Sequence, residues 1–242
     1  MKKTMATETN IEIKLKNVRL SFDNLFEPQV QEGDKIDPQT GEKVKDTSYN
    51  CVLLLDKERD ADQIKLVTDA MVQAREARWP GLNKKIPAER RCMRDGEPEI
   101  DGTREPLYDG YAGQMYISAK RKVKKISDPN PVQLIGPRKE VDPQTGERRF
   151  KQLTRANGGD ELLYGGCYVN AIIRIYAYDG SKDKNPDRIN ASLEVVQHKA
   201  HGERFGAKRV DANSAMDEED GDDDDMPASR PAAGGDAFDP LG

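Results

Sequence analysis

The chain has 242 residues, of which 34% are charged and 35% are hydrophobic, and its mean hydropathy is −0.87. No stretch approaches the roughly 18 uninterrupted apolar residues of a membrane-spanning helix, and the residues after Lys3 are polar, unlike a signal-peptide core. We therefore expect a soluble, cytoplasmic protein without membrane contacts. The three cysteines form no CxxC pair, which argues against a disulfide framework and against a cysteine-rich zinc site.

The first half of the chain contains three candidate strands. Apolar and polar residues alternate over 11–22, with a phase change at Asn17 that indicates a bulge and with Phe22 on the apolar face. The same alternation predicts strands over 49–55 and 115–119.

One helix is predicted between the second and third of these strands. Its apolar residues recur at spacings of three and four: Ile64, Val67, Met71 and Ala74. Asp60 and Gln63 resemble a capping box at its start, and Trp79-Pro80-Gly81 should end it.

The second half of the chain contains the longest predicted strand. Residues 167–178 alternate over a length of about 40 Å, which favours a curved barrel strand, and 189–197 should pair with it. The hexapeptide Asp-Pro-Gln-Thr-Gly-Glu occurs at 37–42 and at 142–147, where its proline and glycine favour two hairpin tips. A duplicated domain is the alternative, although nothing else repeats.

Charge divides the chain into a body and a tail. Residues 211–242 contain eleven acidic residues and one basic residue, a net charge of −10, whereas residues 1–210 carry 38 basic and 33 acidic residues, a net charge of +5. The tail has too few apolar residues to offset the entropy of ordering it. We therefore expect a single domain over 1–210 and a disordered acidic tail over 211–242.

The two faces of the long strand differ in kind. One is small and aliphatic, as a barrel interior requires, and the other carries Tyr168, Arg174, Tyr176 and Tyr178. Aromatic rings beside an arginine can stack nucleic-acid bases. Tyrosines also cover sheets beneath loops or helices, and periodicity alone does not separate the two roles.

Basic residues are concentrated in two other places. Residues 120–125 hold five positive charges close to Tyr108, Tyr111 and Tyr116, a pattern typical of a groove for a phosphate backbone. A second cluster surrounds Phe150 and consists of Arg148, Arg149, Lys151 and Arg155. Either cluster could line such a groove, although a basic run is also common on an ordinary solvated face.

Signals for catalysis are weak, and we expect neither an enzyme nor a cofactor. His198 and His201 are the only histidines, and their spacing of three in a strand end followed by a loop does not direct both toward one metal. The acidic run at 217–225 has no rigid frame to hold Mg²⁺. There is no phosphate-binding glycine loop and no recognisable nucleophile motif.

Several segments together resemble a family of phage single-stranded DNA-binding proteins that was long catalogued as a domain of unknown function. They are residues 15–22 with 25–28, 111–120, and 165–171 continuing through 176–178. The resemblance extends in collinear order over about residues 11–206. It implies a mainly β structure, an OB-fold-like Greek-key barrel with one main helix and long loop insertions.

The resemblance also implies a function and a role for the tail, and the patterns of rings and charges described above predict the DNA-binding residues. The protein would coat single-stranded DNA without sequence preference in phage replication, recombination and repair, in the host cytoplasm, and could form homo-oligomers. The tail would recruit a polymerase, helicase or primase, although Phe238 is not the last residue as aromatic residues often are in such tails. The expected DNA-binding residues are Tyr111, Tyr116, Lys120, Arg121, Lys122, Lys124, Lys125, Tyr168, Arg174, Tyr176 and Tyr178. The expected partner-binding residues are Asp217, Glu218, Glu219, Asp220, Asp222, Asp223, Asp224, Asp225 and Phe238.

Two other classes of protein remain open on the sequence. A virion structural or assembly protein would use a barrel for subunit contacts and would not bind DNA. A metal-dependent nuclease would need His198, His201 and scattered carboxylates to converge.

Overall fold

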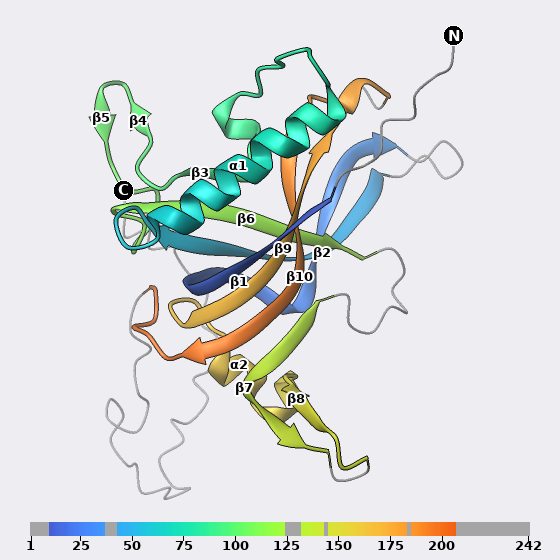
Figure 1. Ribbon diagram of the computed structural model, residues 1–242, viewed down its shortest axis with the longest axis vertical. Coiled ribbons are helices and arrows are strands. Elements are labelled where there is room, and N and C mark those ends of the chain that lie inside the picture. Colours follow the sequence, from blue (N-terminus) through green and yellow to red (C-terminus); the bar gives the residue numbers. More distant parts are fainter. Residues whose placement is uncertain (1–9, 37–42, 124–131, 143–144, 183–184, 207–242) are drawn as a thin grey trace, which may run out of the picture. The chain divides into compact units, whose positions relative to one another are not determined.

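The computed structural model describes residues 10–36, 43–123, 132–142, 145–182 and 185–206 (Figure 1). The strands are β1 (Ile11–Ile36), β2 (Lys43–Asp56), β3 (Met93–Asp95), β4 (Glu99–Ile100), β5 (Thr103–Arg104), β6 (Gln114–Lys122), β7 (Gln133–Val141), β8 (Arg148–Gln152), β9 (Tyr168–Tyr178) and β10 (Arg188–Ala200). The helices are α1 (Ala61–Arg78), α2 (Gly159–Leu162) and the short 3₁₀ turns η1 (Ala88–Arg90), η2 (Arg155–Asn157) and η3 (Gly180–Lys182). None of the described helices is long and apolar enough to cross a membrane.

Five strands close into a barrel. Their order is β6-β2-β1-β9-β10, and β10 returns to β6 through a parallel contact at Ala191 and Ala119. Every other neighbouring pair in the barrel is antiparallel. This is the five-stranded Greek-key arrangement of an OB fold, so the expected fold class is confirmed. β3 extends the sheet beyond β6, and the β7–β8 hairpin extends it beyond β10.

The barrel interior is filled by the small aliphatic face of β9 and by the matching faces of its neighbours. Alternate residues of β9 are at most 1% exposed: Val169, Ala171, Ile173 and Ile175. They pack in one core with Leu15, Val18, Leu20, Leu53, Ile117 and Leu193. The period-two pattern therefore predicted the inward face of the long strand correctly, and β10 pairs with it as expected.

β1 departs from regular strand geometry twice. Its register against β9 shifts between Leu15 and Val18, where Asn17 has a φ of 53°, so the predicted bulge is confirmed. Phe22 also has a positive φ, of 46°, and its side chain is 47% exposed. The expectation that Phe22 shares the buried face is wrong, because its left-handed backbone breaks the alternation of the strand.

Helix α1 packs mainly on β9 through Val67, Ala70, Met71 and Ala74. It ends before Trp79, as predicted, but the capping box at its start is absent. The Asp60 carboxylate instead accepts hydrogen bonds from the Asp56 amide and from the side chains of Arg59 and Gln63. These neighbouring donors occupy the oxygens that would have capped the helix.

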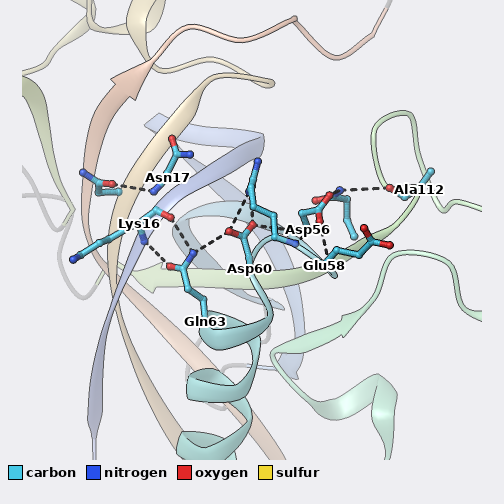
Figure 2. A network of polar contacts seen from close by, with 10 residues as sticks. Lys16, Asn17, Asp56, Glu58, Asp60, Gln63 and Ala112 are labelled. Atoms are coloured by element: carbon cyan, nitrogen blue, oxygen red, sulfur yellow. Dashed lines mark hydrogen bonds and ion pairs between the residues drawn. The ribbon is translucent and has the colours of Figure 1, made fainter.

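A polar network joins the start of α1 to the β1 bulge (Figure 2). The Gln63 side-chain amide accepts from the Lys16 amide at 2.7 Å and donates to the Lys16 carbonyl at 3.0 Å. The Asn17 amide donates to Asn170 Oδ1 at 3.0 Å. The bulge thus has partners for backbone groups that leave the strand ladder, and these bonds hold α1 in position on the barrel.

The described residues include part of one of the two predicted hairpin tips, without residues 143–144. β7 and β8 pair antiparallel on either side of residues 142–147, and the Gly146 amide donates to the Asp142 carbonyl at 2.7 Å. The other tip, at 37–42, lies outside the described residues. So do Lys124, Lys125 and the whole of 211–242.

Candidate nucleic-acid interface

One row of side chains crosses the outer face of the barrel over five strands. Cross-strand pairing places Tyr168 of β9 beside Arg19 of β1, then Leu54 of β2, Tyr116 of β6 and Arg94 of β3. Their sequence neighbours Val169, Leu20, Leu53 and Ile117 point into the core. Because side chains of directly paired residues share a face, the row is a consequence of register alone.

Four aromatic rings gather beside this row, and we call them the aromatic cluster: Phe22, Tyr108, Tyr111 and Tyr116. Ring centres are 4.9 Å apart for Phe22 and Tyr108, 5.3 Å for Tyr108 and Tyr111, and 5.6 Å for Tyr111 and Tyr116. Tyr111 is only 1% exposed and its hydroxyl donates to buried Ser21, whereas Tyr108 is 57% exposed. A buried tyrosine therefore supports two rings, Phe22 and Tyr108, that remain open to solvent.

Guanidinium groups lie over rings at both ends of the row. Arg94 Cζ is 4.9 Å from the centre of the Tyr116 ring. Arg19 Cζ is 4.2 Å from the Phe205 ring and 5.9 Å from the Tyr168 ring. Arginine in this geometry gains cation–π attraction while its remaining N–H groups can still donate to a phosphate.

Backbone contacts fix Arg19 and Phe205. Arg19 donates to the Gly166 carbonyl at 3.1 Å and to the Glu203 carbonyl at 2.8 Å. Gly110 lies so close to Phe205 that an added Cβ would fall 2.1 Å from the ring. The segment that follows β10 is thereby held against the segment that contains Tyr108.

Arg59 adds a further charge next to Tyr168, with its Cζ 5.9 Å from the ring centre. Hydrogen bonding to Asp60 raises the pKa of Arg59 above its ordinary value. Burial raises the pKa values of Tyr111 and Tyr116, so both phenols stay neutral at physiological pH.

Lysines of β6 continue the same outer face. Lys120 pairs with Asn50, and Lys122, which is exposed, pairs with Ser48. Arg121 lies between them on the opposite face and donates to Glu194 at 2.6 Å. The basic run of β6 therefore divides between two faces, as the pleat requires.

Four of the predicted residues line a separate cavity of about 420 Å³ next to the loop between β9 and β10: Arg121, Arg174, Tyr176 and Tyr178. Its arginines face carboxylates. Arg174 lies 3.2 Å from Glu12 and 3.9 Å from Glu194, and Arg78 lies 3.2 Å from Asp179. This cavity is close to charge-balanced, unlike the outer face.

The structure thus places the predicted residues that it describes in two groups. Tyr116, Lys120, Lys122 and Tyr168 lie on the outer face, Tyr111 is buried against Tyr116, and the other four line the cavity. The predicted set lacks Phe22, Tyr108, Arg19, Arg59 and Arg94. The basic and aromatic composition around residue 120 predicted Tyr116, Lys120 and Lys122. Strand register brings Arg19 and Arg94 to the same face, and a positive φ accompanies the exposure of Phe22, whereas Tyr108 and Arg59 lie between the strands.

Reactive groups are few among the described residues. Burial raises the pKa of Cys92 to about 12 and that of Cys167 to about 11, so both thiols are protonated at neutral pH. His198 is buried, and desolvation lowers its pKa. No group of three or more metal-ligating side chains converges within the described chain. The arrangement is suited to stacking and charge neutralisation.

The barrel topology defines an OB-fold protein whose outer face carries rings and cations. A family model described as the single-stranded DNA-binding protein of Enterobacter phage Enc34 matches residues 11–226. The chain belongs to this family, which confirms the resemblance found in the sequence.

Relatives support the same assignment. Putative protein p50 of Acyrthosiphon pisum secondary endosymbiont phage 1 is 30% identical over 204 residues, which cover 81% of this chain and 86% of that protein. The solved structure of the Enc34 protein in complex with single-stranded DNA is 22% identical, with a TM-score of 0.55, over 81% of this chain and 89% of that one. The Enc34 structure described without DNA is also 22% identical, with the same TM-score, over 85% and 90% of the two chains. At this identity the two structures show a shared fold.

Proposed function

We propose that this protein binds single-stranded DNA without sequence preference and coats it during phage replication, recombination and repair. The observation that carries the proposal is the outer face of the barrel, where exposed Phe22 and Tyr108 pack on Tyr111 and, through it, on Tyr116, and where Arg19, Arg94 and Lys120 share the face of Tyr116. An OB fold uses this face, formed by its second and third strands, to bind oligonucleotides. Family membership supports the same function.

Each part of the outer face has a role in this proposal. Phe22 and Tyr108 stack on bases, and each stack contributes about 1–3 kcal/mol whatever the base. Arg94, Arg19 and Lys120 neutralise phosphates. Tyr111 positions the exposed rings from below, because its ring contacts both of them and its hydroxyl is bonded to Ser21.

The remaining predicted residues would extend the path of the DNA. Arg174, Tyr176 and Tyr178 lie beside the loop between β9 and β10, which is the second loop that OB folds use for oligonucleotides. Arg174 already has two carboxylate partners, Glu12 and Glu194. A phosphate must displace these partners, so we expect this cavity to contribute less than the outer face does.

The acidic tail has two proposed roles. Its −10 charge complements the +5 body, so it can occupy the DNA-binding face as a polyanion. When DNA displaces it, the tail becomes available to replication proteins such as a polymerase, helicase or primase.

Equilibrium binding tests the function directly. We expect the full-length protein to raise the fluorescence anisotropy of labelled oligo(dT) far more than that of a duplex of equal length. Neutralising about four to six phosphates gives a log–log salt slope of about −3 to −4 for single strands. Equal affinity for the duplex, or an affinity that does not change with salt concentration, would contradict the proposal that the outer face binds single-stranded DNA. An absence of binding at low salt would favour an assembly role.

A further inference from the structure

The β7–β8 hairpin reaches beyond the barrel and has two chemically different faces. Only Gln133, Leu134 and Ile135 of β7 pair with β10, so the outer part of the hairpin is paired only with itself. In the register of the hairpin, Lys139 pairs with Phe150 and Val141 with Arg148, which places these four side chains on one face. We call this the Phe150 face; Figure 1 shows the hairpin that carries it.

The Phe150 face carries cations and apolar groups but no carboxylate. Phe150 is 37% exposed and Val141 is 62% exposed, and Lys139 Nζ lies 5.4 Å from the Phe150 ring centre. The opposite face is mixed. There, Glu140 pairs with Arg149, and Arg149 also forms an ion pair with Glu147 at 2.5 Å.

We propose that the Phe150 face is a second single-stranded DNA contact, separate from the aromatic cluster, where a base stacks on Phe150 and Lys139 and Arg148 hold the flanking phosphates. The proposal rests on the proposed function and deepens it. A solvent-exposed ring beside two cations, with no acidic group on its face, is the minimal unit of sequence-independent single-strand binding. The negative charge of phosphates complements the positive charge of this face. A single exposed ring without adjacent cations would not indicate a binding site.

Basic side chains also mark the chain between the hairpin and the barrel face. Arg155 follows β8 and forms an ion pair with Glu27 of β1. Tyr164 follows α2, and Arg204 Cζ lies 3.9 Å from its ring centre. Arg204 directly precedes Phe205, which contacts Arg19 on the outer face. Exposed arginines therefore lie both next to the outer face and in the segment that follows the hairpin.

The test compares two double variants of the full-length chain that remove the same charge from opposite faces of one hairpin. Lys139→Gln with Arg148→Gln alters the Phe150 face, and Arg149→Gln with Lys151→Gln is the matched control. Phe150→Ala removes the ring. Binding is measured with an oligo(dT) of about 10 nucleotides, within the span of one OB fold, and with one about three times as long.

We expect K139Q/R148Q and F150A each to lower affinity for the long oligonucleotide by about tenfold, with the short one unaffected. The salt slope for the long oligonucleotide should become shallower by about 1.4 in K139Q/R148Q, because two phosphate contacts are lost. The control should change either affinity by less than about threefold.

Other outcomes overturn the proposal. Equal losses in both double variants would mean that only the net charge of the hairpin matters. Unchanged affinity for the long oligonucleotide would mean that DNA does not reach this face, and tighter binding would mean that the acidic tail occupies it. If the wild-type protein fails to bind the short oligonucleotide, the proposed function itself is wrong, whatever the hairpin does.

Discussion

At the scale of single residues, one exposed ring, that of Phe22, depends on a backbone conformation that is costly for its residue type. Phe22 adopts a left-handed φ, which few bulky residues do without a compensating contact. The compensation here is edge-to-face contact with Tyr108 and Tyr111. The strain is a local cost that places an aromatic ring in solvent at the edge of the aromatic cluster.

Removing either exposed ring should weaken DNA binding without unfolding the protein. We expect Phe22→Ala and Tyr108→Ala each to raise the dissociation constant for oligo(dT) by about 5- to 150-fold, which corresponds to the loss of about 1–3 kcal/mol of stacking. Leu82→Ala is the matched control, since Leu82 is 68% exposed and lies away from these rings in sequence. Fluorescence anisotropy measures affinity, and circular dichroism checks the fold. If both ring variants bind like the control, the DNA lies elsewhere.

At the residue level, charge and composition predicted only part of the candidate interface. Tyr111, Tyr116, Lys120 and Lys122 were predicted from a basic run near tyrosines. The structure places Tyr116, Lys120 and Lys122 on one outer face and buries Tyr111 against Tyr116. Phe22 was assigned to the wrong face because strand alternation assumes a negative φ throughout. Nothing in the local sequence indicates that Arg94 pairs with Tyr116.

At the scale of elements, long periodic segments were predictable and short ones were not. β9 and α1 have enough residues for a period of 2 or 3.6 to emerge. β3, β4 and β5 have two or three residues each, and no periodicity can emerge over that length. β8 is exposed along its whole length, so burial imposes no alternation on it.

The turn into β9 depends on glycine. Gly166 has a φ of 109°, and a Cβ there would fall 2.0 Å from the Glu203 carbonyl oxygen. Gly113 has a φ of 68° but open space around it. We expect Gly113→Ala to lower the free energy of unfolding by about 1–2 kcal/mol from backbone strain alone. Gly166→Ala should lower it by at least about 1–3 kcal/mol more, through steric overlap and strain.

Urea unfolding of the two glycine variants measures this difference. Gly166→Ala should also weaken oligo(dT) binding, because Arg19 donates to the carbonyls of Gly166 and Glu203. If the two variants lose the same free energy of unfolding, the backbone near Glu203 can move away from a Cβ at residue 166 without lowering stability.

At the scale of the whole molecule, charge separates along the chain. The body carries +5 and residues 211–242 carry −10, so removing the tail reverses the sign of the net charge. We expect a 1–210 protein to bind oligo(dT) more tightly than the full chain at about 50 mM salt, with the difference much reduced near 500 mM, where screening is strong.

A control for the tail keeps its length and removes its charge. Replacing the acidic residues of 217–225 by their amides should reproduce the tighter binding of the 1–210 protein. If truncation tightens binding and the amide variant does not, the tail acts by bulk rather than by charge. If neither changes affinity at low salt, the tail does not compete with DNA.

The barrel topology also determines when this protein can fold during its synthesis. β1 lies between β2 and β9, and Leu15 pairs with Ala171, about 150 residues later in the chain. At about 5–20 residues per second, the ribosome needs roughly 8–30 s to supply that partner. During this interval β1 can pair with β2 but has an open hydrogen-bonding edge on its other side, which other nascent chains or chaperones can contact. The nascent chain would therefore face its greatest risk of aggregation before β9 has emerged.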